Sequence, residues 1–197
     1  MDRKPAVPGT FEWGDELPRL SGRRLDLRWL TGGDAPAMLE IFGNAEVMKF
    51  WSSPPLADLV AASQLIDEIH EHFHARRLFQ WGICSRDSSQ VHGTCTLLNV
   101  DLTQRRAEIG FALARGEWGQ GLASEALEVM IRFAFEALGL QRLEADVDPR
   151  NERSLRLLER QGFRREGYLR ERWLHSGETQ DAVFLGLLRR EWTPGQA

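Results

Sequence analysis

A glycine-rich segment between residues 108 and 125 gives the clearest chemical signal in the chain. Gly116, Gly119 and Gly121 follow an apolar run and precede a segment whose apolar residues recur every three or four positions. This spacing predicts a strand, a tight turn and an amphipathic helix in immediate succession. The first turn of a helix has unpaired N–H groups and a partial positive charge, and glycines let an anion approach that backbone closely. The segment therefore predicts an anion site, suited above all to a pyrophosphate.

The same segment fits neither of two common nucleotide-binding signatures. Its glycines do not form G-x-G-x-x-G, and the chain contains no G-x-x-x-x-G-K-[ST]. Taken alone, the glycines could equally mark an ordinary connection between a strand and a helix.

A histidine cluster suggests a different chemistry. The run His70-Glu71-His72-Phe73-His74 fits H-E-x-x-H, in which two histidines one helical turn apart bind zinc and the glutamate is the base of a metalloprotease. No later helical segment supplies a convincing third ligand, and the chain soon enters a strand. We expect a solvated helix face and no metal here, with a zinc metalloprotease as the remote alternative.

The elements that must position these residues alternate between strands and helices. Apolar patterning predicts strands at 23–30, 79–85, 93–100, 107–113, 142–147, 167–173 and 182–188. It predicts helices at 34–42, with Asp34 as a cap, and at 57–75, 122–138 and 152–161. Because one helix connects the strands at 107–113 and 142–147, we expect those two strands to be parallel. The fold class is α/β of the α+β kind.

Composition narrows the remaining function classes. A length of 197 residues indicates one domain, and a net charge of −4 argues against broad nucleic-acid binding. No run of about eighteen apolar residues predicts a membrane span, and the first residues do not resemble a secretory signal. Cys84 and Cys95 lack metal-ligand spacing and are expected to be buried free thiols. We expect a cytoplasmic protein with no nucleic-acid partner and no membrane partner.

Four segments, in order, resemble one family. Trp118-x-x-Gly121-x-Ala123 is similar to the acyl-coenzyme A loop [QR]-x-x-G-x-[GA] of the GCN5-related N-acetyltransferase (GNAT) superfamily, with Trp118 where Gln or Arg is usual. Asn151-x-x-Ser154 resembles its ribosomal-protein N-acetyltransferase branch (RimJ/RimL type). The tail segments at 166–170 and 177–181 also resemble that branch, so the resemblance covers residues 20–192.

This resemblance implies a GNAT-like acyl-CoA N-acyltransferase fold. Its mixed, mostly antiparallel sheet is flanked by helices and splays between the fourth and fifth strands, where acetyl-CoA lies. The domain would span 21–193, after an irregular arm at 1–20. The pantetheine arm would pair with the fourth strand and the pyrophosphate would lie on the amides of the glycine loop. The implied donor-binding residues are Phe111, Ala112, Leu113, Trp118, Gly119, Gln120, Gly121, Leu122, Ala123, Ser124, Asn151 and Ser154.

Two residues are candidates for the chemistry that the resemblance implies. Glu108, beside the split, is the candidate base that removes a proton from the acceptor ammonium, with Glu166 and Asp181 as rivals. Ser154 is the candidate hydrogen-bond donor to the departing thiolate. Members of the superfamily often use a Tyr four residues further on, where this chain has Leu158.

Alternatives stay open at each of these positions. Glu108 could be a charge on the polar face of a strand, and Ser154 could be a helix N-terminal residue that satisfies backbone N–H groups. Asn151 could cap the same helix or bond the pantetheine amides. Tyr168, the only tyrosine, is a further candidate acid.

The expected activity is transfer of an acetyl group from acetyl-CoA to a primary amine by direct attack in a ternary complex. The amine could belong to a protein N-terminus or to a small molecule. Because Trp118 departs from the motif and the tyrosine is missing, a non-catalytic acyl-CoA-binding regulatory protein is the main alternative. Seven tryptophans leave room for an aromatic contact surface and a homodimer.

Overall fold

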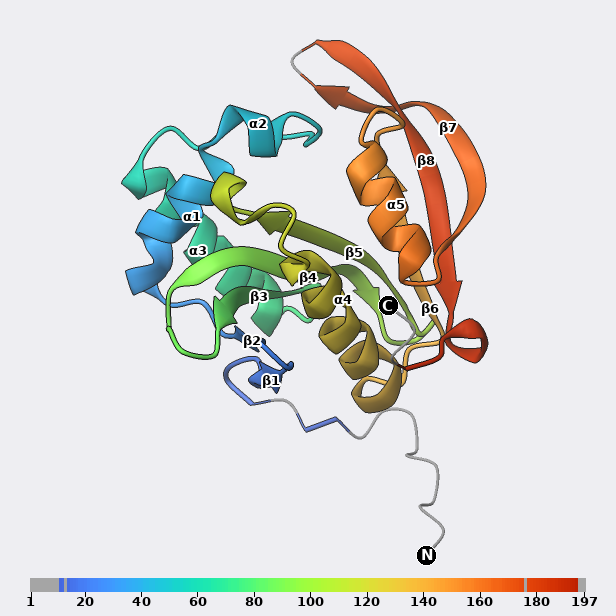
Figure 1. The fold of residues 1–197 in the computed structure, drawn as a ribbon, viewed down its shortest axis with the longest axis horizontal. Helices are drawn as coiled ribbons and strands as arrows, with labels where there is room; N and C mark the ends of the chain where they lie inside the picture. Colours follow the sequence, from blue (N-terminus) through green and yellow to red (C-terminus); the bar gives the residue numbers. More distant parts are fainter. Residues whose placement is uncertain (1–10, 13, 176, 195–197) are drawn as a thin grey trace, which may run out of the picture.

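The computed structural model describes residues 11–12, 14–175 and 177–194. These residues form one eight-stranded sheet with the order β1-β2-β3-β4-β5-β6-β8-β7 (Figure 1). The strands are β1 Leu20–Ser21, β2 Leu25–Arg28, β3 Leu78–Ser85, β4 Val91–Asp101, β5 Arg106–Leu113, β6 Arg142–Val147, β7 Arg164–His175 and β8 Glu178–Leu188. Every pair is antiparallel except β5 and β6, which are parallel as expected from the single helix that connects them.

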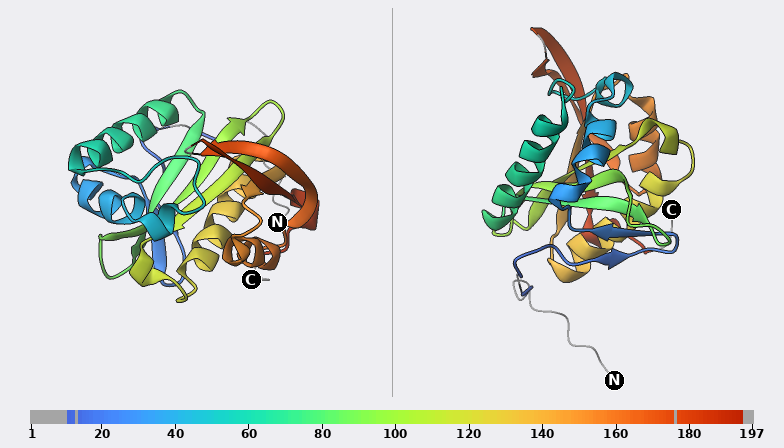
Figure 2. Two further views of the ribbon diagram at one scale, coloured as in Figure 1. Left: turned by 90° about the horizontal axis from the view of Figure 1, so that it is seen from above. Right: turned by 90° about the vertical axis from the view of Figure 1, so that its left-hand side faces the viewer.

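Helices cover both faces of the sheet (Figure 2). Buried residues of α1 Ala35–Phe42, α2 Ala45–Met48 and α3 Leu59–His74 form one apolar core. Those of α4 Leu122–Arg132 and α5 Glu152–Arg160 pack into a larger core on the other side. Short helical turns complete the described chain at η1 Gly32–Asp34, η2 Arg115–Glu117, η3 Phe133–Ala137 and η4 Arg189–Glu191. No helix in the described ranges is long and apolar enough to cross a membrane.

The seven predicted strands and four main helices are all present, and the differences lie in short or bent elements. The two-residue strand β1 was not predicted because it is defined only by its pairing with β2. The single turn α2 is stabilised by Asn44, whose side chain accepts from two backbone N–H groups. The predicted long helix after Gly121 changes to π geometry over η3 before Gly139, whose φ of +69° ends it.

Asp34 begins α1 as predicted, but its carboxylate does not cap that helix. The carboxylate accepts two hydrogen bonds from the Arg28 guanidinium, at 2.6 and 2.8 Å, and one from the Thr31 backbone N–H at 2.7 Å. The interpretation of the side chain as a cap was therefore wrong. The guanidinium of the half-buried Arg28 is the stronger partner because the hydrogen bond is charge-assisted on both sides.

The N-terminal segment packs onto the sheet where it is described. Leu17 is buried in the larger core, and the indole N–H of Trp81 donates to the Pro18 carbonyl at 3.0 Å. The predicted arm at 1–20 lies partly outside the described residues, at 1–10 and 13, and Leu20 opens β1. Cys84 and Cys95 are buried free thiols, as predicted.

Candidate active site

The sheet divides between β5 and β6. Their pairing extends from Arg106 opposite Arg142 to Glu108 opposite Glu144, although both strands continue. Beyond that point β5 stays paired with β4, whereas β6 stays paired with β8. The predicted split between the fourth and fifth strands is therefore present, numbered here as β5 and β6.

The backbone of β5 offers hydrogen-bonding groups to this split. The Ala114 N–H donates to the His92 carbonyl at 2.8 Å, which makes these two residues a hydrogen-bonded pair of the antiparallel ladder. Because such pairs alternate, Ala112 is bonded to β4, whereas Phe111 and Leu113 direct their N–H and C=O groups towards the split. Of the three residues expected to bind pantetheine, Phe111 thus has the suitable backbone orientation, whereas the carbonyl of Leu113 is already bound by the Trp118 indole.

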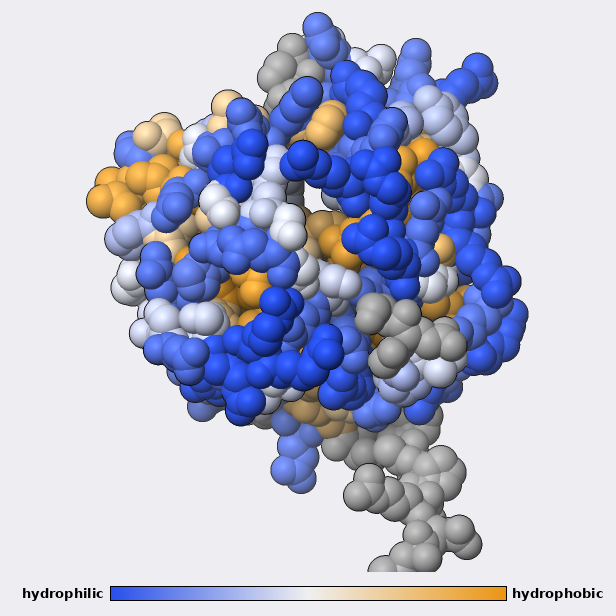
Figure 3. Space-filling view, viewed as in Figure 1, coloured by the Kyte–Doolittle hydropathy of each residue, from blue (hydrophilic) through white to orange (hydrophobic). Residues whose placement is uncertain are grey.

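The glycine loop closes one end of the split. Gly119 and Gly121 have φ angles of +81° and +78°, a region that strongly favours glycine. Gly121 is the N-cap of α4 and no side chain caps that helix. The N–H groups of Gly121, Leu122, Ala123 and Ser124 make no hydrogen bond within the described chain. The space-filling view is hollowed beside this loop, between η2 and α2 on one side and α5 with β7 on the other (Figure 3).

Side chains bind the carbonyl groups of the loop. The Trp118 indole donates to the Leu113 carbonyl at 3.0 Å, and the Gln120 side chain donates to the Gly116 carbonyl at 3.2 Å. A carbonyl dipole that points at an anion repels it. These contacts occupy the carbonyls of Leu113, at the end of β5, and of Gly116, while the N–H groups from Gly121 to Ser124 stay free.

Two guanidinium groups lie over the Trp118 ring. The Arg115 guanidinium is 4.7 Å and the Arg153 guanidinium 5.3 Å from its ring centroid. Gln or Arg, which are usual at this position in the motif, could not hold two guanidiniums by cation–π contact. Trp118 therefore links η2, through Arg115, to the first turn of α5, through Arg153, and Arg115 is also ion-paired with Glu46 of α2.

Glu108 lies at the start of the split. One carboxylate oxygen accepts from the Asn99 amide at 3.0 Å. Burial raises the pKa of Glu108, reinforced by the negative charges of Asp146 and Glu144 and opposed by the Asn99 hydrogen bond and the Arg172 charge. A carboxylate with a raised pKa is the better base near neutral pH.

Glu166 and Asp181, the rival candidates for the base, lie in environments that lower their pKa. Arg142 donates to both oxygens of Glu166 and lowers its pKa. Asp181 accepts from the Glu171 N–H and the Tyr168 hydroxyl, at 2.8 and 2.7 Å, which lower its pKa. The same bond raises the pKa of Tyr168 and makes it a weaker acid. The direction of the pKa shifts thus favours Glu108 over Glu166 and Asp181 as the proposed base, and makes Tyr168 less suited to act as the acid.

The first turn of α5 separates the roles of Asn151 and Ser154. The Asn151 side chain caps the helix by accepting from the Ser154 backbone N–H at 3.2 Å. Ser154 is half-buried, and its hydroxyl makes no hydrogen bond to any other described residue. The cap that was an alternative role for Ser154 is thus provided by Asn151, and the hydroxyl remains available.

A cavity of about 510 Å³ lies on the α1–α3 side of the sheet. Gly110 of β5 contributes to its wall, two residues beyond Glu108 and therefore on the same face of the strand. Most of the lining is apolar, and Glu68 is the single ionisable side chain among the described lining residues. The full lining is Phe42, Met48, Trp51, Ser53, Pro54, Pro55, Leu56, Ala57, Ala61, Gln64, Leu65, Glu68, Leu78, Gln80, Thr96, Leu98 and Gly110.

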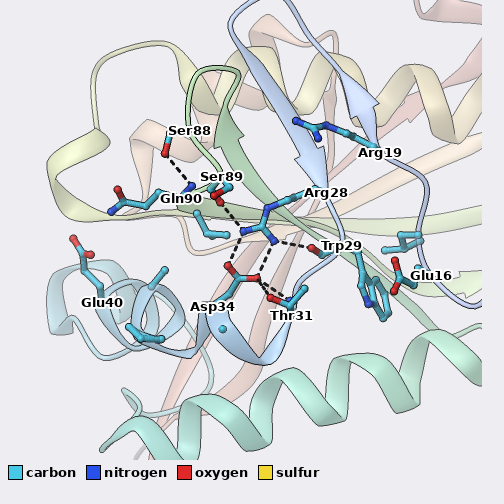
Figure 4. Close-up of a pocket in the computed structure, with 15 residues that line it drawn as sticks. Glu16, Arg19, Arg28, Trp29, Thr31, Asp34, Glu40, Ser88, Ser89 and Gln90 are labelled. Atoms are coloured by element: carbon cyan, nitrogen blue, oxygen red, sulfur yellow. Dashed lines mark hydrogen bonds and ion pairs between the residues drawn. The ribbon is translucent and has the colours of Figure 1, made fainter.

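A larger hollow of about 870 Å³ lies elsewhere, between η1, α1 and the turn that connects β3 with β4. Figure 4 shows Arg28 and Asp34 of its lining in direct contact, as an ion pair of 2.6 Å. None of the candidate donor-binding or catalytic residues lines this hollow. Its polar groups serve the ion pair that anchors η1, so it is not the site described above.

The histidine cluster takes part in packing. His70 stacks on Trp29, and its Nε2 is 2.9 Å from the Leu30 carbonyl. His74 Nδ1 is 2.7 Å from the His70 carbonyl. Among the described residues no group of three or more potential ligands could hold a metal ion.

Comparison with known proteins agrees with this geometry. Residues 24–164 match the family described as Acetyltransferase (GNAT) domain. This chain belongs to the GNAT acetyltransferase family. The match covers most of the chain and includes both the glycine loop and α5.

Relatives of known name are acetyltransferases. The chain is 34% identical over 176 residues to the uncharacterized N-acetyltransferase p20 of Bacillus licheniformis, covering 89% of this chain and 99% of that one. It is 30% identical over 198 residues to the [ribosomal protein uS5]-alanine N-acetyltransferase of Escherichia coli K12, covering 94% and 100%. It is 28% identical over 181 residues to the spermidine N(1)-acetyltransferase of the same strain, covering 89% and 95%.

Among solved structures, the fold is similar to Mycobacterium smegmatis RimJ in complex with CoA-disulfide. The TM-score is 0.81 at 24% identity, covering 88% of each chain. The protein is therefore an acyltransferase of the GNAT fold, and acetyl-CoA is the cosubstrate of this family. Neither the metalloprotease nor the non-catalytic alternative finds support in these matches.

Proposed function

We propose that this protein transfers the acetyl group of acetyl-CoA to a primary amine within the split between β5 and β6. The observation that carries the proposal is the row of free N–H groups from Gly121 to Ser124 at the end of that split. A pyrophosphate would accept hydrogen bonds from these amides and from the positive end of α4. The pantetheine arm would pair with the outward backbone groups of Phe111, placing the thioester near Glu108 and Ser154.

The residues of the split support direct attack without a covalent enzyme intermediate. Glu108 accepts a proton from the acceptor ammonium, directly or through a water molecule, and the neutral amine attacks the thioester carbon. The tetrahedral intermediate collapses with cleavage of the C–S bond, the attacking nitrogen loses its second proton to give the amide, and that proton converts the leaving thiolate to CoA-SH. The Ser154 hydroxyl donates a hydrogen bond to the departing sulfur. Asn151 keeps the first turn of α5 in place by capping it.

We propose a protein or peptide N-terminus as the acceptor, bound in the 510 Å³ cavity. A polyamine carries several positive charges and is best bound by several unpaired carboxylates. This cavity has mainly apolar walls and one carboxylate, Glu68. Of the carboxylates near the split, Glu144, Asp146 and Glu166 are each paired with an arginine, whereas Glu108, the proposed base, accepts from Asn99. A single ammonium attached to a small apolar residue suits these walls better.

The first test is isothermal titration of the purified chain with acetyl-CoA. We expect micromolar binding with one site per chain. Absence of binding would overturn the proposed donor site, whatever the acceptor.

The second test compares acceptors at a fixed acetyl-CoA concentration. Peptides with a free N-terminal Ala or Ser are assayed against the same peptides with a blocked N-terminus and against spermidine, with mass spectrometry of the product. We expect acetylation of the free peptides at higher kcat/KM than spermidine. A higher kcat/KM for spermidine would contradict the proposed acceptor but leave the donor site intact.

A further inference from the structure

Arg24, from the turn between β1 and β2, contacts the glycine loop although the two are about a hundred positions apart in sequence. Its Nη1 donates to the Gln120 carbonyl at 3.2 Å. Its Nε donates to one carboxylate oxygen of Glu125 at 2.9 Å, and its backbone N–H donates to the other at 2.7 Å. One residue thus binds both the loop and the first turn of α4.

Glu125 is a buried carboxylate that serves this contact. Its side chain is 3% exposed, and the Arg24 guanidinium is its ion-pair partner. The turn before Arg24 is shaped around it, since a Cβ on Gly22 would lie only 2.8 Å from a Glu125 carboxylate oxygen. Glu125 therefore fixes the direction of the Arg24 side chain.

The peptide unit held by Arg24 is the one that decides the orientation of a donor-site amide. In a trans peptide the N–H points opposite to the preceding carbonyl, so the Gln120 carbonyl and the Gly121 N–H point in opposite directions. Glycines on both sides of Gln120 allow this peptide to rotate at little steric cost. With the carbonyl bound to Arg24, the Gly121 N–H is held on the opposite side of the loop.

We propose that Arg24, oriented by Glu125, is a positioning residue that holds the Gln120–Gly121 peptide so that the Gly121 N–H faces the donor pyrophosphate. This inference rests on the proposed donor site. Without Arg24 the peptide can turn its carbonyl towards the phosphates, where it repels them.

The test is the affinity for acetyl-CoA of Arg24→Met, compared with Arg132→Met as the matched control. Arg132 is in α4, its side chain is about as exposed as that of Arg24, and it forms an ion pair with Glu128 of the same helix. Both variants lose one positive charge and one ion pair. We expect a Kd about tenfold higher for Arg24→Met and within about twofold of wild type for Arg132→Met.

A third variant and a second ligand separate positioning from charge and from folding. Arg24→Lys keeps the charge but replaces the separate donors Nε and Nη1, which bind Glu125 and Gln120, by one ammonium group, so its Kd should also rise. The increase for Arg24→Met should be as large with dephospho-CoA, which keeps the pyrophosphate, as with CoA.

Each outcome decides between distinct failures. If wild type does not bind acetyl-CoA, the proposed function fails. If wild type binds and the two methionine variants bind equally well, only the role of Arg24 is overturned. If Arg24→Met proves unstable by thermal melting, wild-type affinity in a stable Arg24→Lys variant overturns it too.

Discussion

At the scale of single residues, the environment of Glu108 predicts the pH dependence of the reaction. A base must be deprotonated to act, and the pKa of Glu108 is raised by burial. The acid limb of kcat/KM should therefore lie above the ordinary glutamate range, with activity lost as pH falls through that pKa. Glu108→Gln should lower kcat by about 10²–10⁴-fold and remove this limb. A pH profile unchanged in that variant would exclude Glu108 as the base.

Asn99 offers a more selective change at the same site. The hydrogen bond that its side-chain amide donates to Glu108 lowers the pKa of that carboxyl, so losing this hydrogen bond raises the pKa further. Asn99 has a φ of +50°, and Asn99→Gly removes the donor while tolerating that backbone conformation. The acid limb should move to higher pH with little change in the plateau rate. A shift to lower pH, or none, would contradict the assigned role of the bond.

Ser154 and Asn151 are expected to respond differently to alanine. Ser154→Ala should reduce kcat about tenfold and leave the melting temperature near wild type, because its hydroxyl supports no other described residue. Asn151→Ala removes the cap of α5 and should cost about 1 kcal/mol of stability. Thermal melts and steady-state rates on both variants distinguish these roles. A destabilised Ser154→Ala protein with normal kcat would assign Ser154 to folding instead.

At the scale of elements, we propose that the strand, the glycine loop and the helix together bind the anion. Gly121→Glu places a side chain at a φ of +78° and a negative charge beside the free amides. It should abolish acetyl-CoA binding. Gly177→Glu is the matched control, since it adds the same charge at a φ of +84°, in the hairpin between β7 and β8. Titration calorimetry should show loss of binding in the first variant alone.

At the scale of the whole molecule, the two parts of the sheet on either side of the split are joined by only three paired positions of β5 and β6. A donor bound along β5 and against α5 adds contacts across that junction. At about 100 times its Kd it should stabilise the fold by about 2.7 kcal/mol. For a domain of this size that corresponds to a melting temperature about 5–10 °C higher. Scanning calorimetry with and without acetyl-CoA checks this, and no increase at saturating ligand would contradict it.

The sequence by itself determined the elements and the loop. Apolar periodicity located the seven longer strands, and three glycines located the turn between a strand and a helix where the anion site is proposed, because these signals depend on neighbours in the chain. Four segments in order, among them the motif at Trp118, Gly121 and Ala123, indicated the family, which the comparisons confirmed. The expected roles of Glu108 and Ser154 remain predictions for the experiments above.

Only the tertiary structure decided which groups are free and which are engaged. Arg24 meets Gln120 and Glu125 across about a hundred residues, and no local pattern encodes such a contact. Asn151 rather than Ser154 caps α5. Arg28 donates to the carboxylate of Asp34, because a charged donor forms the stronger hydrogen bond with a carboxylate. The split itself exists because β5 stays paired with β4 while β6 stays paired with β8, and this pairing is a property of the whole sheet.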